Sequence, residues 1–103
     1  MELAIPDLRR FPPGATALPF EVGPDHLGFD TLDTATQRGV SHHYYFADGQ
    51  VGRFDCPFRY AWPAELDLMA EMAGMALRER VADWDRSPFT SESLKHISVW
   101  QRP

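Results

Sequence analysis

The dipeptide Asp48-Gly49 separates two runs of β-type sequence and thereby limits the folds open to this chain. A two-residue type I′ turn needs positive φ at both central positions, and Asp-Gly accepts that geometry readily. Residues 51–60 alternate between apolar and polar side chains, as a half-buried strand does. The sequence therefore predicts a β-hairpin over residues 38–60. With a two-residue turn, the register pairs Phe46 with Val51, Tyr44 with Arg53, and His42 with Asp55.

One main helix is predicted near residues 63–74. Pro63 suits the first helical position, the acidic residues Glu65 and Asp67 fall in the first turn, and Gly74 is a typical stop signal. Five other segments are typical of strands: residues 1–5, 17–22, 27–33, 76–84 and 95–101. We therefore expect an α+β fold, a single domain over residues 1–103, with the helix packed on a mainly antiparallel sheet that includes the 38–60 hairpin.

Composition narrows the class of protein. With 103 residues, of which 44% are hydrophobic, the chain has the content of one globular domain. Its net charge of −5 argues against nucleic-acid binding, and its single cysteine, Cys56, rules out an internal disulfide. No apolar run is long enough to span a bilayer and no signal peptide is recognisable, so we expect a cytoplasmic protein without membrane contact. The basic residues are Arg apart from Lys95, and Asn is absent, a bias typical of a GC-rich bacterial gene.

The second half of the chain has a recognisable order. Residues 63–74 (PAELDLMAEMAG) are followed by a predicted strand, then by residues 82–93 (ADWDRSPFTSES) and a final strand. This order resembles the C-terminal end of class I S-adenosylmethionine-dependent methyltransferases that act on small molecules. In that family a helix leads into the sixth strand, and a loop of the type D-x-D-x-S-P-x-T-x-x-S leads into an antiparallel seventh strand.

The resemblance has consequences for topology and for the cofactor. It implies that residues 38–60 are the antiparallel insert after the family's fifth strand, that residues 2–7 end that strand, and that residues 95–101 lie between 1–5 and 76–84. The family's cofactor half needs a glycine-rich turn for close approach of the backbone, and no G-x-G-x-x-G occurs here. We therefore expect a truncated, methyltransferase-like domain without its own S-adenosylmethionine site and without any other cofactor.

The hairpin offers two candidate sites for proton transfer. His42 opposite Asp55 forms a carboxylate–imidazole pair, the usual way to fix a tautomer and prepare a general base, although a surface charge pair is the alternative interpretation. His43 falls on the other face with Tyr45, where it is either catalytic or a packed, hydrogen-bonded residue. Adjacent strand residues point to opposite faces, so His42 and His43 cannot chelate one metal ion. Cys56 adds no metal signature, and no metal site is expected.

The substrate-binding candidates are two arginines and two aromatic residues: Arg53, Arg59, Tyr44 and Trp84. The arginines would orient an acidic group, although solvated arginines on a strand face are the commoner outcome. Trp84 offers an aromatic wall, although its loop is largely structural in the family. The chain is rich in aromatic residues, and a mostly apolar pocket for a flat, polyketide-like molecule would use part of them.

Three functions stay open at this point. The first is a methyltransferase-derived domain that binds a small aromatic or polyketide-like molecule of specialised metabolism, or that completes a split methyltransferase. The second is a stand-alone, cofactor-independent acid–base enzyme that catalyses a cyclisation, isomerisation or dehydration. The third is a non-catalytic binding or regulatory module. Residues 1–5 would form a weakly protected edge beside uncovered apolar surface, which predicts a homodimer or docking on a partner methyltransferase chain.

Overall fold

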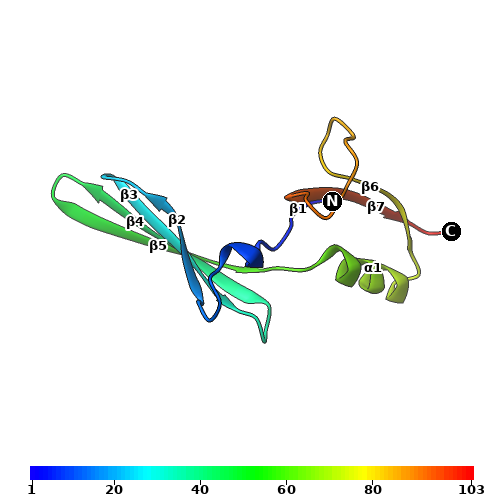
Figure 1. The fold of residues 1–103 in the computed structure, drawn as a ribbon, viewed down its shortest axis with the longest axis horizontal. Coiled ribbons are helices and arrows are strands. Elements are labelled where there is room, and N and C mark those ends of the chain that lie inside the picture. The colour runs from blue at the N-terminus through cyan, green and yellow to red at the C-terminus, as the bar shows by residue number, and fades with distance from the viewer. The chain divides into compact units, whose positions relative to one another are not determined.

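The computed structural model describes residues 1–103 and contains seven strands and one α-helix (Figure 1). All strand pairs are antiparallel, so the expected α+β class with one main helix is confirmed. The chain divides into two compact units. The first unit combines Met1–Asp7 with Ala61–Pro103, and the second unit is Leu8–Tyr60. Each unit has its own sheet, and the single domain expected from the length stays a prediction.

The first unit contains a three-stranded sheet in the order β1-β7-β6. Its strands are β1 (Glu2–Ala4), β6 (Ala76–Val81) and β7 (Lys95–Gln101). The prediction that the last strand lies between the first strand and the strand after the helix is therefore confirmed. The chain start also pairs with β7, because the Met1 amino group donates to the Ser98 carbonyl at 2.8 Å.

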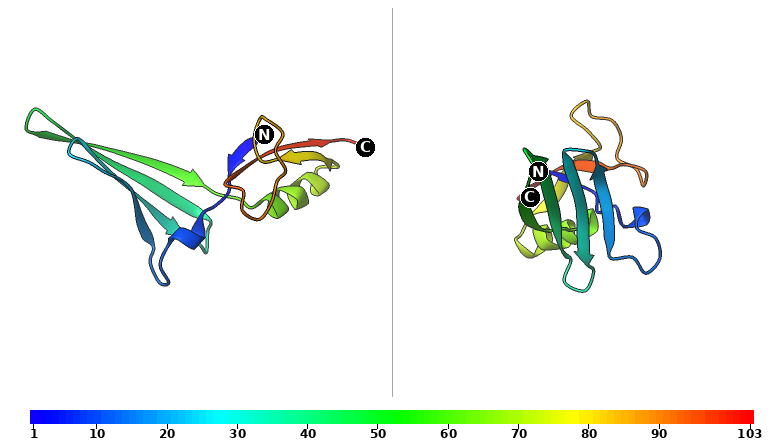
Figure 2. Two further views of the ribbon diagram at one scale, coloured as in Figure 1. Left: turned by 45° about the horizontal axis from the view of Figure 1, so that its top comes forward. Right: turned by 90° about the vertical axis from the view of Figure 1, so that its left-hand side faces the viewer.

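The helix α1 (Pro63–Met72) packs against β6 and begins at the predicted residue (Figure 2). Pro63 is its first residue, and the Trp62 backbone N–H donates to the Glu65 carboxylate at 3.3 Å. Gly74 has a φ of +78°, which a glycine adopts at no steric cost, so the helix stops two residues earlier than expected. The helix spans ten residues, and no helix here has the length and apolarity needed to cross a bilayer.

A polar network joins α1 to the sheet. The Arg80 guanidinium on β6 donates to both Asp67 carboxylate oxygens, at 2.6 and 3.1 Å, and to Ser98 Oγ at 2.8 Å. The Trp100 indole donates to the same Asp67 carboxylate at 2.8 Å. The hydrogen bonds from Arg80 are the main cause of the lowered pKa of Asp67. Asp67 is therefore the point where helix and sheet are held together.

The centre of β7 is buried and includes a histidine. His96 and Ser98 are fully buried, and Ile97 is 6% exposed. Because Ser98 Oγ accepts from Arg80, its own proton is directed to His96 Nδ1, 2.7 Å away. His96 Nε2 is buried without a hydrogen-bond partner. Burial lowers the pKa of His96, so this side chain is neutral in the folded protein.

The second unit is a four-stranded sheet in the order β2-β3-β4-β5. Its strands are β2 (Ala17–Val22), β3 (His26–Asp33), β4 (Arg38–Ala47) and β5 (Gln50–Arg59). The predicted turn is confirmed, since Asp48 and Gly49 have φ of 52° and 72°. The predicted register is confirmed too, with Phe46 opposite Val51, Tyr44 opposite Arg53, and His42 opposite Asp55.

Two details of the expected fold are wrong. The 38–60 hairpin belongs to the sheet of the second unit, whereas α1 packs on the other sheet, so no single sheet carries both. The strand expected over residues 76–84 ends at Val81. It ends there because the chain turns: the Ala82 N–H donates to the Ser87 carbonyl at 2.8 Å, and the Asp83 carboxylate accepts from the Trp84 N–H at 2.7 Å.

Candidate functional site

The alternation of β4 divides the candidate residues between two faces of one sheet. His42 and Tyr44 lie on one face, which we call the dyad face, while His43 and Tyr45 lie on the opposite face. The side chains of this sheet are at least partly exposed, since Gly28 and Gly39 are the only buried residues of the second unit. Groups on both faces are therefore accessible to small molecules.

The dyad face brings His42 and Asp55 into direct contact. His42 Nδ1 lies 3.0 Å from Asp55 Oδ1, and the side chains are 18% and 38% exposed. Arg53 donates to the other carboxylate oxygen, Oδ2, at 2.9 Å. Hydrogen bonds from Arg53 first and from His42 second lower the pKa of Asp55. The carboxylate is thus ionised at neutral pH, and it accepts a hydrogen bond from Nδ1–H of the imidazole.

Thr31 completes a chain of three groups that the sequence did not suggest. Its Oγ1 lies 3.0 Å from His42 Nε2, on the far side of the ring from Asp55. Since Asp55 fixes the proton on Nδ1, a neutral His42 presents Nε2 as an acceptor, and the Thr31 hydroxyl donates to it. Thr31 is on β3, and the hairpin turn that sets the β4–β5 register gives no register for β3, so the sequence carried no signal for this contact.

Aromatic rings surround this chain of groups. Phe29 stacks on His42 with ring centroids 4.7 Å apart, and the Tyr44 ring lies 6.3 Å from Phe29 at an angle of 10°. The Arg53 guanidinium sits over Tyr44, 5.8 Å from the ring centre. Among the predicted substrate-binding residues, Tyr44 and Arg53 are therefore brought to His42 and Asp55.

His43 has a different environment on the opposite face. Its Nδ1 lies 3.0 Å from Nε2 of His26, and the two ring planes are nearly parallel, at 3°. His26 stacks on Tyr45 at 4.5 Å, and Phe20 approaches His43 edge-on at 5.2 Å. The structure therefore places Tyr45 near His43, as expected, but the polar partner of His43 is an imidazole rather than a carboxylate. His26 was not recognised from the sequence, because a single His in a strand carries no signal of its own.

The last two candidates are Arg59 and Trp84. Arg59 is on the dyad face opposite Arg38, at the end of β5. Trp84 belongs to the first unit, where its indole donates to the Glu2 carboxylate at 3.1 Å and the side chain is 68% exposed. Neither has a described contact with the His42–Asp55 pair.

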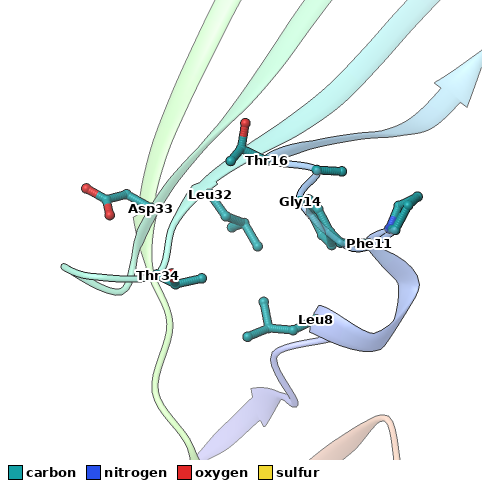
Figure 3. Close-up of a pocket in the computed structure, with 9 residues that line it drawn as sticks. Leu8, Phe11, Gly14, Thr16, Leu32, Asp33 and Thr34 are labelled. Atoms are coloured by element: carbon teal, nitrogen blue, oxygen red, sulfur yellow. The ribbon is translucent and has the colours of Figure 1, made fainter.

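Two hollows open on the second unit. The larger, of about 630 Å³, has Leu8 and Leu32 pointing toward one another and contains none of the predicted site residues (Figure 3). The smaller has a volume of about 420 Å³. It is lined by Thr31, Leu32, Asp33, Thr36, Arg38, Gly39 and Val40. Thr31 thus connects His42 to a space of ligand size.

The start of α1 lacks the glycine-rich turn of a class I S-adenosylmethionine site. A class I cofactor site needs a glycine-rich turn that opens a helix. The only α-helix here, α1, follows Ala61 and Trp62 and begins with Pro63. Nor does the structure bring together three or more His, Cys, Asp or Glu side chains that could hold a metal ion.

Comparison with known proteins gives a structural likeness to a methyltransferase. No family profile and no curated protein matches the chain. The solved structure of the CcbJ methyltransferase from Streptomyces caelestis superposes with a TM-score of 0.78 at 33% sequence identity. The superposition covers 99% of this chain and 44% of that protein, so this chain spans less than half the length of its structural relative. The fold is therefore methyltransferase-like, as the resemblance implied.

Proposed function

We propose that this chain is the substrate-side portion of a small-molecule methyltransferase and works with a cofactor-binding portion on the same or another polypeptide. The likeness to the Streptomyces caelestis methyltransferase, which extends over 99% of this chain, is the observation that carries the proposal. The absence of a glycine-rich turn before α1 supports a division of labour in which another segment binds S-adenosylmethionine.

The dyad face suggests the class of substrate. Phe29, His42 and Tyr44 present stacked rings, and Arg53 adds a cation beside them. Stacked rings bind flat aromatic molecules, and a guanidinium binds an acidic substituent. We therefore assign a small aromatic or polyketide-like substrate of specialised metabolism.

A partner chain is part of this proposal. In the first unit β1 is an edge strand, and Leu3 and Val99 are 36% and 40% exposed. Unpaired edges and apolar surface are usually covered in soluble proteins, either by a second copy or by another chain. We expect an interface of more than about 1,000 Å² in total.

Calorimetry with S-adenosylmethionine tests the proposed function. The chain alone should give no binding heat, whereas its mixture with the segment of the Streptomyces protein that it does not match should bind the cofactor. Micromolar binding by the chain alone, or a mixture that neither associates nor binds, would contradict the proposal. Light scattering on the same samples reports whether the chain is a dimer.

The His42–Asp55 pair favours a second candidate, a cofactor-independent acid–base enzyme. A carboxylate-held imidazole beside an aromatic surface suits proton abstraction next to a carbonyl, the step that cyclisation, isomerisation and dehydration share. Deuterium incorporation from heavy water into small aromatic ketones measures this step. Changing His42 to Ala should slow incorporation about a hundredfold, and the same change at His43 should not. Equal rates in the two variants would remove this candidate.

A further inference from the structure

The linear arrangement of Thr31, His42 and Asp55 has the geometry of an activated nucleophile. Both hydrogen bonds of the His42 ring are 3.0 Å long, one to Thr31 Oγ1 and one to Asp55 Oδ1. A hydroxyl within hydrogen-bond reach of a base, with the base oriented by a third group, is the general signature of nucleophilic catalysis. The competing acceptor for the hydroxyl, the Val40 carbonyl, is farther away at 3.5 Å.

The orientation of His42 is fixed by several independent contacts. Arg53 holds the Asp55 carboxylate through both oxygens, at 2.9 and 3.4 Å. Phe29 stacks on the imidazole ring at 4.7 Å. Because the ring is held on both edges and on a face, Nε2 is directed at Thr31 rather than at solvent.

Thr31 also lines a hollow in the surface. The smaller hollow, of about 420 Å³, includes Thr31 in its lining, and Arg38 is the only cation there. The Thr31–Val40 and Asp33–Arg38 pairs share the dyad face with His42. An acyl group in this hollow would therefore meet Thr31, with Arg38 available to stabilise negative charge on its carbonyl oxygen.

We propose that Thr31 is a nucleophile for acyl transfer from small, activated carboxylic esters, with His42 as its general base and Asp55 as the residue that orients His42. Thr31 Oγ1 forms a bond to the ester carbonyl carbon while its proton passes to His42 Nε2. The bond from that carbon to the leaving alcohol breaks, and the alcohol takes the proton from His42. Water then attacks the acyl-threonine, gives a proton to His42, and the proton returns to Thr31 Oγ1 as the carboxylic acid leaves.

This activity goes beyond the methyltransferase role and does not depend on it. The two are distinguishable because acyl transfer needs neither S-adenosylmethionine nor a partner portion. It also differs from acid–base catalysis by His42 alone, since only the nucleophilic route leaves an acyl group on Thr31.

The test uses the full chain with p-nitrophenyl acetate, with release of p-nitrophenolate and peptide mass mapping after acid quench as readouts. The acetyl group should be found on Thr31, and Thr31→Val should lower the rate about a hundredfold. Thr16→Val is the matched control, because Thr16 is exposed and lies outside the dyad; it should keep the full rate. Thr31→Ser retains the hydroxyl and should still be acetylated.

Two results would overturn the proposal. One is an acetyl group on His42 or Lys95 with none on Thr31. The other is a Thr31→Val variant that keeps the full rate. Circular dichroism shows whether the Thr31→Val variant is folded. If it is not, the test rests on acetylation of residue 31 in the wild-type chain and in the Thr31→Ser variant. Absence of the acetyl group from both would reject Thr31 as the nucleophile.

Discussion

The first unit supports its sheet with a helix and a buried polar network, whereas the second unit leaves every side chain of its four strands at least partly exposed. In the first unit, Arg80 and Asp67 hold helix to sheet, and His96 and Ser98 lie at the centre of β7. In the second unit, rings stack on one another and over buried glycines. The first unit buries polar side chains at its centre, whereas the second unit leaves its polar side chains partly exposed on both faces of the sheet.

The sequence supplies a separate reporter for each unit. All three Trp residues (Trp62, Trp84 and Trp100) belong to the first unit, and all three Tyr residues (Tyr44, Tyr45 and Tyr60) belong to the second. Tryptophan fluorescence therefore follows unfolding of the first unit, and tyrosine NMR signals follow the second.

The largest expected effect comes from removing the Asp67 carboxylate. Asp67→Ala leaves the Arg80 guanidinium, 13% exposed, without its main partner, and we expect the first unit to lose about 3 kcal/mol of stability. Urea unfolding followed by tryptophan fluorescence measures this loss. Glu71→Ala, an exposed position on the same helix, is the matched control and should change little. Equal midpoints for the two variants would show that the network does not hold α1 on the sheet.

A smaller effect is expected from a methyl group at Gly28 in the second unit. A Cβ at Gly28 would collide with the Phe20 ring, so Gly28→Ala should cost about 1–3 kcal/mol in the stability reported by tyrosine signals. Gly52 is the control, because a Cβ there meets only the Tyr45 carbonyl oxygen, at 3.9 Å. Gly52→Ala should be close to neutral. Should Gly28→Ala prove equally neutral, ring packing over glycine would not support this sheet.

Mild acid should weaken the first unit through His96. Burial holds the pKa of His96 below its ordinary value of 6.5, so the unfolded chain takes up a proton first as pH falls. The stabilisation that neutral His96 contributes is complete above about pH 6.5 and is lost progressively below it. The stabilisation from ionised Asp67 is lost only below about pH 4, because its pKa is also lowered. Urea midpoints by tryptophan fluorescence should fall between pH 7 and pH 5. His96→Met should flatten this fall, and a wild-type midpoint constant over the range would contradict it.

The smallest effect on stability is expected at Arg53, although its effect on Asp55 is measurable. Arg53 and Asp55 form an exposed pair, and such pairs contribute little to folding. The hydrogen bond from Arg53 is nevertheless the main cause of the lowered pKa of Asp55, so Arg53→Gln should raise that pKa toward its ordinary value. An NMR titration of the Asp55 carboxyl measures the shift. An unchanged titration curve would assign the lowered pKa to His42 alone.

Local sequence signals predicted the elements and one register well. Asp48-Gly49 determines a two-residue turn, and that turn alone determines that His42 faces Asp55. Pro63 and Gly74 mark the two ends of α1 because both act through the backbone of their own neighbourhood. Such signals are readable from sequence since they involve residues close along the chain.

Contacts between distant segments could not be read in the same way. The β3–β4 register depends on the longer connection over residues 34–37, where Gln37 has a positive φ of 55°, and it determines the position of Thr31. The division into two sheets likewise depends on which strands pair with each other, and the sequence of a single strand does not specify its neighbour. His96 gave no signal because its burial results from the packing of the assembled first unit.

Because His42 and His43 are neighbours on β4, a one-residue insertion between them and the turn would change which histidine faces Asp55. The hairpin register is counted from the Asp48-Gly49 turn, and each step along the strand changes the face. One residue inserted after Tyr45 would shift the count by one, so that Asp55 would oppose His43 instead of His42. A single codon gained at this point of the strand would thus transfer the carboxylate from one histidine to the other, a larger change of chemistry than most point substitutions produce.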